Sequence, residues 1–276
     1  MRLRLDKLLT EMTEGSRSEV KQWIKKGQIS VDGAVIKHPE IKVDPDQQEI
    51  LFRGERIQYH QYEYYMLHKP QGVVSATTDT EHTTVVSLIT RSKRKDLFPV
   101  GRLDLDTEGL LLITNDGALA HRLLSPKCHV DKTYLARIKG ALTESDVERL
   151  EQGMDIGDDK LTLPAVVEWY QVLSSEMAST EKEQSVSQAE MEYHIEVGQT
   201  ESGAGLECYT EVGITIYEGR YHQVKRMFAG LGKPVVYLKR LRMGSLVLDE
   251  DLAPGEYREL TPEEITSLHA GKTHIG

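Results

Sequence analysis

The stretch GRLDLDTEGLLLITNDG, residues 101–117, sets acidic side chains directly before an apolar run. Asp104, Asp106 and Glu108 alternate along the chain, and the apolar residues 110–113 follow them. A short apolar run bounded by turn-forming residues is typical of a buried strand. The acids therefore stand at the entrance to a buried strand, where they could form a metal-binding loop, an acidic turn or the source of a nucleophile.

Calcium is the first chemistry to consider for alternating acids before a glycine. An EF-hand loop needs oxygen ligands at alternate positions, a glycine at its sixth position and a glutamate at its twelfth. The stretch matches the first half, but its twelfth residue is Asn115 and its seventh to tenth residues, 110–113, are apolar. We therefore expect no metal site here. An acidic turn that leads into a strand through Gly109 stays open.

The composition is that of a globular protein of 276 residues, 39% hydrophobic and 28% charged. This length is enough for one large domain or two smaller ones. No apolar run reaches the length of a membrane-spanning helix, and the first residues lack the apolar core of a secretory signal. Cys128 and Cys208 lack metal-ligand spacing, so we interpret them as free thiols. The sequence thus predicts a protein of the reducing cytoplasm.

The net charge of −10 hides an uneven distribution. Residues 171–212 carry nine Glu, one Lys and no Asp, and we interpret this segment as an acidic, flexible insertion. Residues 219–242 carry seven basic residues and no acid. Because local patches rather than the total charge make a phosphate-binding surface, nucleic acid remains a candidate partner.

Residues 1–59 are expected to form a small domain of two helices and a hairpin. Ser16 and Glu19 form a capping box at the start of the second helix, and Gly27 marks its end. The segment QISVDGAVIK, residues 28–37, alternates around an Asp-Gly pair, which predicts a hairpin. This arrangement resembles the S4 RNA-binding domain.

The S4 resemblance implies that basic side chains on or beside the second helix bind RNA. Two of them are one helical turn apart and share a face. A solvated amphipathic helix would carry the same charges, but the hairpin that follows favours RNA binding. The residues concerned are Arg17, Lys21, Lys25 and Lys26.

Residues 62–276 form the second predicted domain. Residues 85–89, VVSLI, have the pattern of a short helix start. Because strand and helix signals do not alternate regularly, we expect an α+β fold rather than a doubly wound one. Strands are predicted at residues 63–69, 132–140, 163–170, 212–219 and 234–248, and helices at 118–123, 143–153 and 222–232 and from residue 262.

Several motifs together resemble the RsuA-type pseudouridine synthases, which isomerise uridine in ribosomal RNA. They are GRLDLDTEGLLLITNDG, HRLLSPK, DKTYLARI and EGRYHQVKRMF, with HKPQG and the closing LAPGEYREL. The resemblance spans nearly the whole chain, and only residues 171–212 depart from it. It implies a catalytic domain built on a mixed, mainly antiparallel sheet.

The reaction that this resemblance implies breaks the bond between N1 of uracil and C1′ of ribose, turns the base and rejoins it through C5. It exchanges no electrons or phosphate, so it implies no cofactor, and the sequence has no P-loop. The resemblance assigns the nucleophile to Asp104, since a carboxylate suits the oxocarbenium-like centre at C1′. Direct attack and a glycal route both stay open. Asp106 and Glu108 are then turn or surface groups.

A reactive carboxylate beside a buried strand needs a cation, or its pKa would rise. The family pattern favours Lys225 of HQVKR as the partner of Asp104, with Arg226 as the alternative. Tyr134 matches the family's active-site tyrosine, which would stack on the flipped uracil or assist loss of the C5 proton; a core tyrosine is the alternative. Arg102 would bind phosphate or help to flip the base.

Phosphate contacts are expected from the basic stretch near the end of the chain. We assign no catalytic role to the histidines near the motifs, because lone histidines beside motifs are more often structural. The expected phosphate-binding residues are Arg220, Lys239, Arg240 and Arg242, and the unassigned histidines are His121, His129 and His222.

The expected partner is ribosomal RNA, with the S4-like segment holding a neighbouring stem. The pattern of SPKCHVDKTY with LAPGEYREL favours the small-subunit enzyme of the family, which acts on uridine 516 of 16S rRNA. An enzyme for 23S rRNA and a non-catalytic S4-type ribosome-assembly factor are the alternatives. The family resemblance implies a monomer.

Overall fold

The computed structural model describes residues 2–13, 15–57, 59, 61–173 and 208–271. Its contacts divide the chain into two compact units, and the first contains residues 1–63, 89–98 and 114–116. The second contains residues 64–88, 99–113 and 117–276. The domain boundary at residues 59–62 stays a prediction, because the contacts assign two later segments to the first unit. Within the described ranges no helix is long and apolar enough to cross a membrane.

The first unit packs two helices and short strands around an aliphatic core. The Ser16 hydroxyl accepts a hydrogen bond from the Glu19 amide, and the Glu19 carboxylate accepts one from the Ser16 amide, so the predicted capping box is confirmed. Asp32 and Gly33 have φ of 49° and 79°, as a type I′ hairpin turn requires. The elements are β1 Leu3–Arg4, α1 Leu5–Met12, α2 Arg17–Lys25, β2 Ile29–Val31, β3 Ala34–Ile36, β4 Lys42–Val43, β5 Ile50–Phe52 and β6 Glu55–Arg56.

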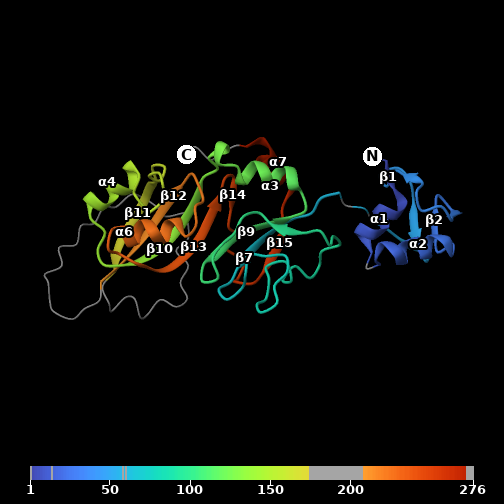
Figure 1. Cartoon of the computed structure of the whole chain (residues 1–276), viewed down its shortest axis with the longest axis horizontal. Helices are drawn as coiled ribbons and strands as arrows, with labels where there is room; N and C mark the ends of the chain where they lie inside the picture. Colours follow the sequence, from blue (N-terminus) through green and yellow to red (C-terminus); the bar gives the residue numbers. More distant parts are fainter. Residues whose placement is uncertain (1, 14, 58, 60, 174–207, 272–276) are drawn as a thin grey trace. The chain divides into compact units, whose positions relative to one another are not determined.

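The second unit is built on a long, strongly twisted sheet (Figure 1). Its strands follow the order β11-β12-β10-β13-β9-β7-β15, with β14 paired to β13. β13 and β9 run parallel, whereas β10 is antiparallel to both β12 and β13, which confirms the mixed, mainly antiparallel sheet. The strands are β7 Tyr64–Lys69, β8 Phe98–Pro99, β9 Glu108–Thr114, β10 Lys132–Lys139, β11 Val166–Leu173, β12 Tyr209–Ile216, β13 Val235–Met243, β14 Leu246–Val247 and β15 Tyr257–Glu259.

Helices cover this sheet at two places (Figure 1). α6 contacts β13 and α4 contacts β11. α3 and α7 lie side by side, and the Arg122 guanidinium donates a hydrogen bond to the Leu268 carbonyl at 2.8 Å. The elements are α3 Gly117–Leu124, the 3-10 turn η1 Pro126–Cys128, α4 Glu144–Gln152, α6 Gln223–Gly230 and α7 Pro262–Ala270.

A close approach between β9 and β13 brings the acidic stretch into the middle of the sheet. Gly109 lies opposite Arg240 in the parallel pair and has φ of 104°. A Cβ on this residue would lie 2.2 Å from the Arg240 carbonyl oxygen. Because only glycine tolerates both the conformation and the contact, this position fixes where the loop that carries Asp104 meets β13.

Two sequence-based expectations need correction. Residues 171–173 end β11 and residues 209–212 begin β12, so the ends of the expected 171–212 insertion are strand; residues 174–207 lie outside the described residues. Residues 85–88 form a turn and not a helix.

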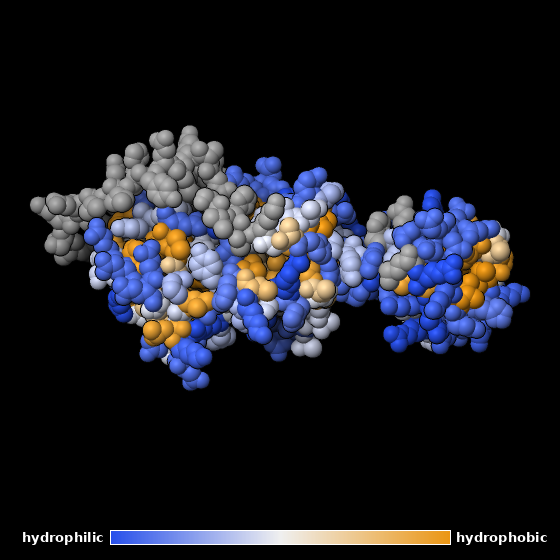
Figure 2. Space-filling model, turned by 90° about the horizontal axis from the view of Figure 1, so that it is seen from above, coloured by the Kyte–Doolittle hydropathy of each residue, from blue (hydrophilic) through white to orange (hydrophobic). Residues whose placement is uncertain are grey.

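The face shown in Figure 2 is mostly hydrophilic, with hydrophobic residues in separate small areas.

Candidate functional site

A cleft in the second unit gathers the motifs that the sequence set far apart. It has about 650 Å³ of open space. Its walls come from the loop before β9, from β10 and β13, and from the start of α6. Asp104 and Tyr134 both line it, as do Arg102 and Lys225. The cleft is therefore the candidate active site.

Asp104 is the carboxylate of this cleft, and its side chain is 28% exposed. Its Oδ2 lies 3.1 Å from the Lys225 ammonium, and its Oδ1 lies 3.3 Å from Nε2 of His222. A half-buried carboxylate held between two cationic or hydrogen-bonding groups is restricted to one orientation. Such a group can act as a nucleophile or as an electrostatic partner of a developing positive centre.

Lys225 is shared by two acids. Its ammonium also lies 2.5 Å from Oδ1 of Asp106. Burial lowers the pKa of Lys225, but hydrogen bonds to Asp106 and Asp104 outweigh this and leave the pKa above its ordinary value. The same Lys225 contact lowers the pKa of Asp106. Asp106 lies in a turn and is exposed, as expected, and it also helps to hold the cation that faces Asp104.

His222 is a site residue that the sequence interpretation left unassigned. It precedes α6 in a left-handed conformation, with φ of 48°, which a non-glycine residue adopts only when its surroundings enforce it. Its ring stacks on Tyr221 with centroids 3.8 Å apart. Since His222 stands three residues before Lys225 in the motif that supplies the partner of Asp104, the helical i,i+3 spacing could have indicated it.

Lys69, from the motif HKPQG, supports the loop beneath Asp104. Its side chain is 0% exposed. Its ammonium donates hydrogen bonds to the carbonyls of Pro70 and Thr107, both at 2.9 Å, and approaches the Leu105 carbonyl at 3.5 Å. Burial lowers the pKa of Lys69 to about 8, and the nearby carboxylates of Asp106 and Asp104 oppose this shift. The lysine therefore holds the backbone on both sides of Asp106.

Three side chains from β10 and β13 line the same cleft. Lys132 and Tyr134 stand two residues apart on β10, so they share a face of the sheet. Arg240 lies opposite Tyr134 in the β10–β13 register. All three are buried and line the cleft. Burial of Arg240 argues against its expected phosphate contact, because its guanidinium does not reach an RNA backbone outside the cleft.

Arg226 does not pair with Asp104, so the alternative assignment from the sequence is wrong. Successive residues on a helix point about 100° apart, and Arg226 turns away from Lys225 toward Asp158. Its Nη2 lies 2.5 Å from Oδ1 of Asp158, and it also donates to the Ile156 carbonyl.

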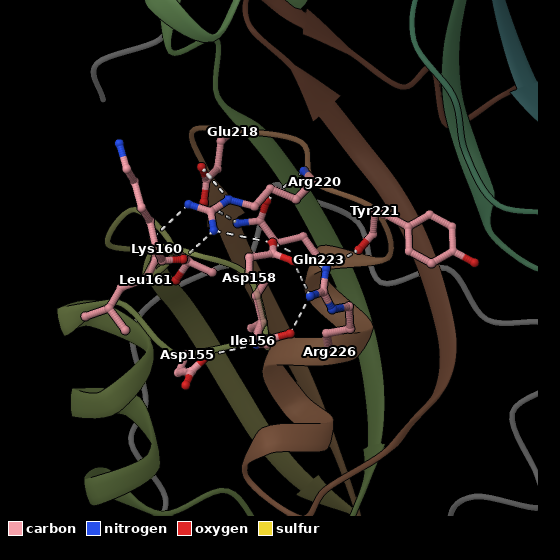
Figure 3. Close-up of polar contacts among 12 residues, drawn as sticks. Asp155, Ile156, Asp158, Lys160, Leu161, Glu218, Arg220, Tyr221, Gln223 and Arg226 are labelled. Carbon is pink, nitrogen blue, oxygen red and sulfur yellow. Dashed lines mark hydrogen bonds and ion pairs between the residues drawn. The ribbon is translucent and has the colours of Figure 1, made fainter.

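Arg220 reaches the same segment (Figure 3). It donates to the carbonyls of Lys160 and Leu161, both at 2.7 Å, and its Nη1 lies 3.4 Å from Asp158. Hydrogen bonds from Arg226 and then Arg220 lower the pKa of Asp158. Through these contacts, Asp158, Arg220 and Arg226 join the segment after α4 to the chain that carries His222 and Lys225.

The other expected RNA-binding residues divide into exposed and internal groups. Arg102 is exposed at the cleft. Arg242 forms ion pairs with Asp131 and Glu168, which argues against a phosphate contact. Burial lowers the pKa of Lys239. In the first unit, exposed side chains occur at Arg17, Lys21, Lys25 and Lys26.

Among the residues that the structure describes, no group of three His, Cys, Asp or Glu side chains could hold a metal ion. Cys128 and Cys208 are both free thiols. The cleft thus offers the carboxylate of Asp104, a stacking ring at Tyr134 and several cations. These groups suit a reaction at an electron-poor carbon beside a flat base.

Comparison with known proteins agrees with this chemistry. Residues 63–230 match the family described as RNA pseudouridylate synthase, and residues 3–48 match the S4 domain. The chain is 45% identical to an uncharacterised RNA pseudouridine synthase of Bacillus subtilis, YtzG, over 97% of this chain and 98% of the relative. It is 37% identical to ribosomal small subunit pseudouridine synthase A of Escherichia coli, over 96% of this chain and 100% of that relative.

A solved structure supports the same assignment. A crystal structure of a pseudouridylate synthase aligns with a TM-score of 0.58 and 34% identity, covering 96% of this chain and 99% of the other. The alignment covers nearly the whole chain, so the likeness does not depend on one motif. The chain belongs to the RNA pseudouridine synthase family.

Proposed function

We propose that this protein converts uridine to pseudouridine in small-subunit ribosomal RNA, at uridine 516 of 16S rRNA, with Asp104 as nucleophile. The observation that carries the catalytic part is the contact of Asp104 with Lys225 and His222 inside the cleft. The relative from Escherichia coli named for the small subunit supports the target. Large-subunit 23S rRNA is the alternative substrate.

In this proposal Asp104 acts at C1′ as the glycosidic bond breaks. Lys225 orients the carboxylate through its ammonium, while Asp106 holds the other side of the ammonium. Tyr134, buried on β10 and lining the cleft, stacks on the uracil that has been turned out of the RNA. Direct attack on C1′ and a glycal route use the same placement of Asp104.

RNA binding would come from two places. The S4 match supports contacts of the α2 lysines, Lys21 and Lys25, with an RNA stem, and exposed Arg102 would contact phosphate beside the cleft. Because these contacts neutralise phosphates, affinity should fall steeply as the salt concentration rises. We propose that the enzyme works as a monomer in the cytoplasm, without a cofactor.

The experiment that tests the target is a map of new pseudouridines. Purified protein is incubated, without added cofactor, with unmodified 16S and 23S rRNA, each as naked RNA and as subunit-assembly particles. Carbodiimide labelling and primer extension then locate the product. A single new stop at uridine 516 is expected, whereas a stop only in 23S rRNA would overturn the small-subunit target. RNA binding without any stop would favour a non-catalytic assembly factor.

A further inference from the structure

Two cations are buried in the wall of the cleft that Asp104 also lines. Arg240 is 2% exposed and Lys132 is 8% exposed. The Arg240 Nε donates to the Leu110 carbonyl at 2.8 Å, and the Lys132 ammonium donates to the Val130 carbonyl at 2.6 Å. In the part of the chain that the structure describes, Nη2 of Arg240 is buried without a hydrogen-bond partner.

Burying these charges is unfavourable in the protein alone. A buried cation normally has a carboxylate or several acceptors around it. Asp131, the residue before Lys132, forms its ion pair with Arg242 through Oδ2, and in the described part of the chain its Oδ1 is buried without a hydrogen-bond partner. Burial and the neighbouring charge of Arg240 lower the pKa of Lys132 to about 8. The printed hydrogen bonds of Lys132 and Arg240 go to backbone carbonyls and not to a carboxylate, which favours a ligand that brings negative charge.

The position of the two cations indicates which part of the substrate they meet. Lys132 shares a sheet face with Tyr134, and Arg240 lies across from Tyr134 on β13. Since Tyr134 is the ring on which the uracil would stack, groups on either side of it reach the edge of the base. Asp104 lines the same cleft from another wall, where the ribose would lie.

We propose that Lys132 and Arg240 bind the carbonyl edge of the uracil and stabilise the negative charge that the base carries when it leaves C1′. As the C1′–N1 bond breaks, its electron pair moves onto the ring and spreads over N1, O2 and O4. C5 then returns a pair to C1′, the C5 proton is lost and N1 takes up a proton. The sum is an isomerisation without any co-reactant.

Phosphate is the competing ligand for a pair of cations. The side chains of Lys132 and Arg240 are almost wholly buried. A phosphate of the RNA backbone, in contrast, stays outside the pocket that holds the base. Arg102, exposed beside the cleft, is better placed for phosphate. A contact to the base should affect the chemical step, while a contact to phosphate should affect RNA affinity.

The test compares Lys132→Met with Lys132→Arg in single-turnover assays on the RNA substrate, with RNA affinity measured separately. Removal of a preorganised donor to a developing anion typically lowers the rate by about a hundredfold or more. We expect that loss for Lys132→Met, with affinity within about twofold of wild type, since the contact strengthens as the bond breaks. Lys132→Arg should restore most of the rate, because it keeps the charge.

Lys127→Met, which removes an exposed lysine from η1, serves as the control for a lost surface charge. Melting curves identify a variant that fails to fold, and Lys132→Gln, which keeps a donor, then replaces Lys132→Met. An unchanged rate, or a loss confined to RNA affinity, would overturn the proposal in favour of a structural or phosphate-binding role. The inference rests on the proposed reaction but not on Asp104 as its nucleophile. An active Asp104→Asn variant would refute the role of Asp104 and would leave the inference unchanged.

Discussion

Replacing Lys69 by methionine should change how the stability of the catalytic unit depends on pH. Lys69 is 0% exposed and its ammonium contacts carbonyl groups only. Its pKa falls from 10.5 to about 8. Each pKa unit corresponds to about 1.4 kcal/mol, so the buried charge costs the native state about 3 kcal/mol at neutral pH.

The sign of the pH effect follows from which state releases the proton first. The native protein loses the Lys69 proton near pH 8, whereas the unfolded chain keeps it to about pH 10.5. Between these values the unfolded state binds more protons, so the stability of the wild type rises with pH. The methionine side chain of the Lys69→Met variant has no proton to lose. The difference in the free energy of unfolding, wild type minus Lys69→Met, should therefore increase by about 2 kcal/mol between about pH 7.5 and pH 10.

The assay is urea unfolding followed by tryptophan fluorescence. The two tryptophans, Trp23 and Trp169, lie in different units, so a Trp23→Phe background leaves Trp169 to report the catalytic unit alone. Other titrating groups are common to both proteins and cancel in the difference. Lys127→Met, which replaces an exposed lysine in the same unit, should show no such gain. A difference that stays flat or falls with pH would refute the desolvated charge at Lys69.

Three further perturbations test how the site is held and how RNA binds. Asp158→Asn removes the carboxylate that Arg220 and Arg226 share, so the single-turnover rate should fall about tenfold through misplacement of Lys225; a loss of RNA affinity instead would contradict a positioning role. Gly109→Ala forces a Cβ against the Arg240 carbonyl and should lower the free energy of unfolding by about 3 kcal/mol, with a change below about 0.5 kcal/mol counting against the close approach. The double change Lys21→Gln and Lys25→Gln should reduce the slope of log affinity against log salt by about 1 to 2, as measured by titrating labelled RNA at several salt concentrations; an unchanged slope would exclude contacts from α2.

Local signals in the sequence were enough for much of the fold. The capping box at Ser16 begins its helix as predicted, because side-chain and backbone groups three residues apart satisfy each other. The Asp-Gly turn at Asp32 gives its hairpin for the same local reason. The turn at residues 85–88 shows the limit, since a short apolar run does not distinguish a helix from a buried turn.

The site was predictable where a motif carries its own chemistry. Asp104 and Lys225 meet as the family pattern implied. The partner of Arg226 was not predictable, because Asp158 lies in a loop whose position depends on α4 and β11 rather than on local sequence. The burial of Arg240 and Lys132 could not be predicted either. Basic residues in a strand indicate an exposed surface unless the register of the neighbouring strands is known.

The central claim is that Asp104 performs the chemistry. The most direct test is the single-turnover rate of pseudouridine formation by Asp104→Asn, with RNA affinity measured in parallel and Asp106→Asn as the matched variant that removes the other carboxylate at Lys225. We predict at least about a thousandfold lower rate for Asp104→Asn with affinity retained, and less than about a tenfold loss for Asp106→Asn. Wild-type rates for Asp104→Asn, or a larger loss for Asp106→Asn, would contradict the assignment of the nucleophile.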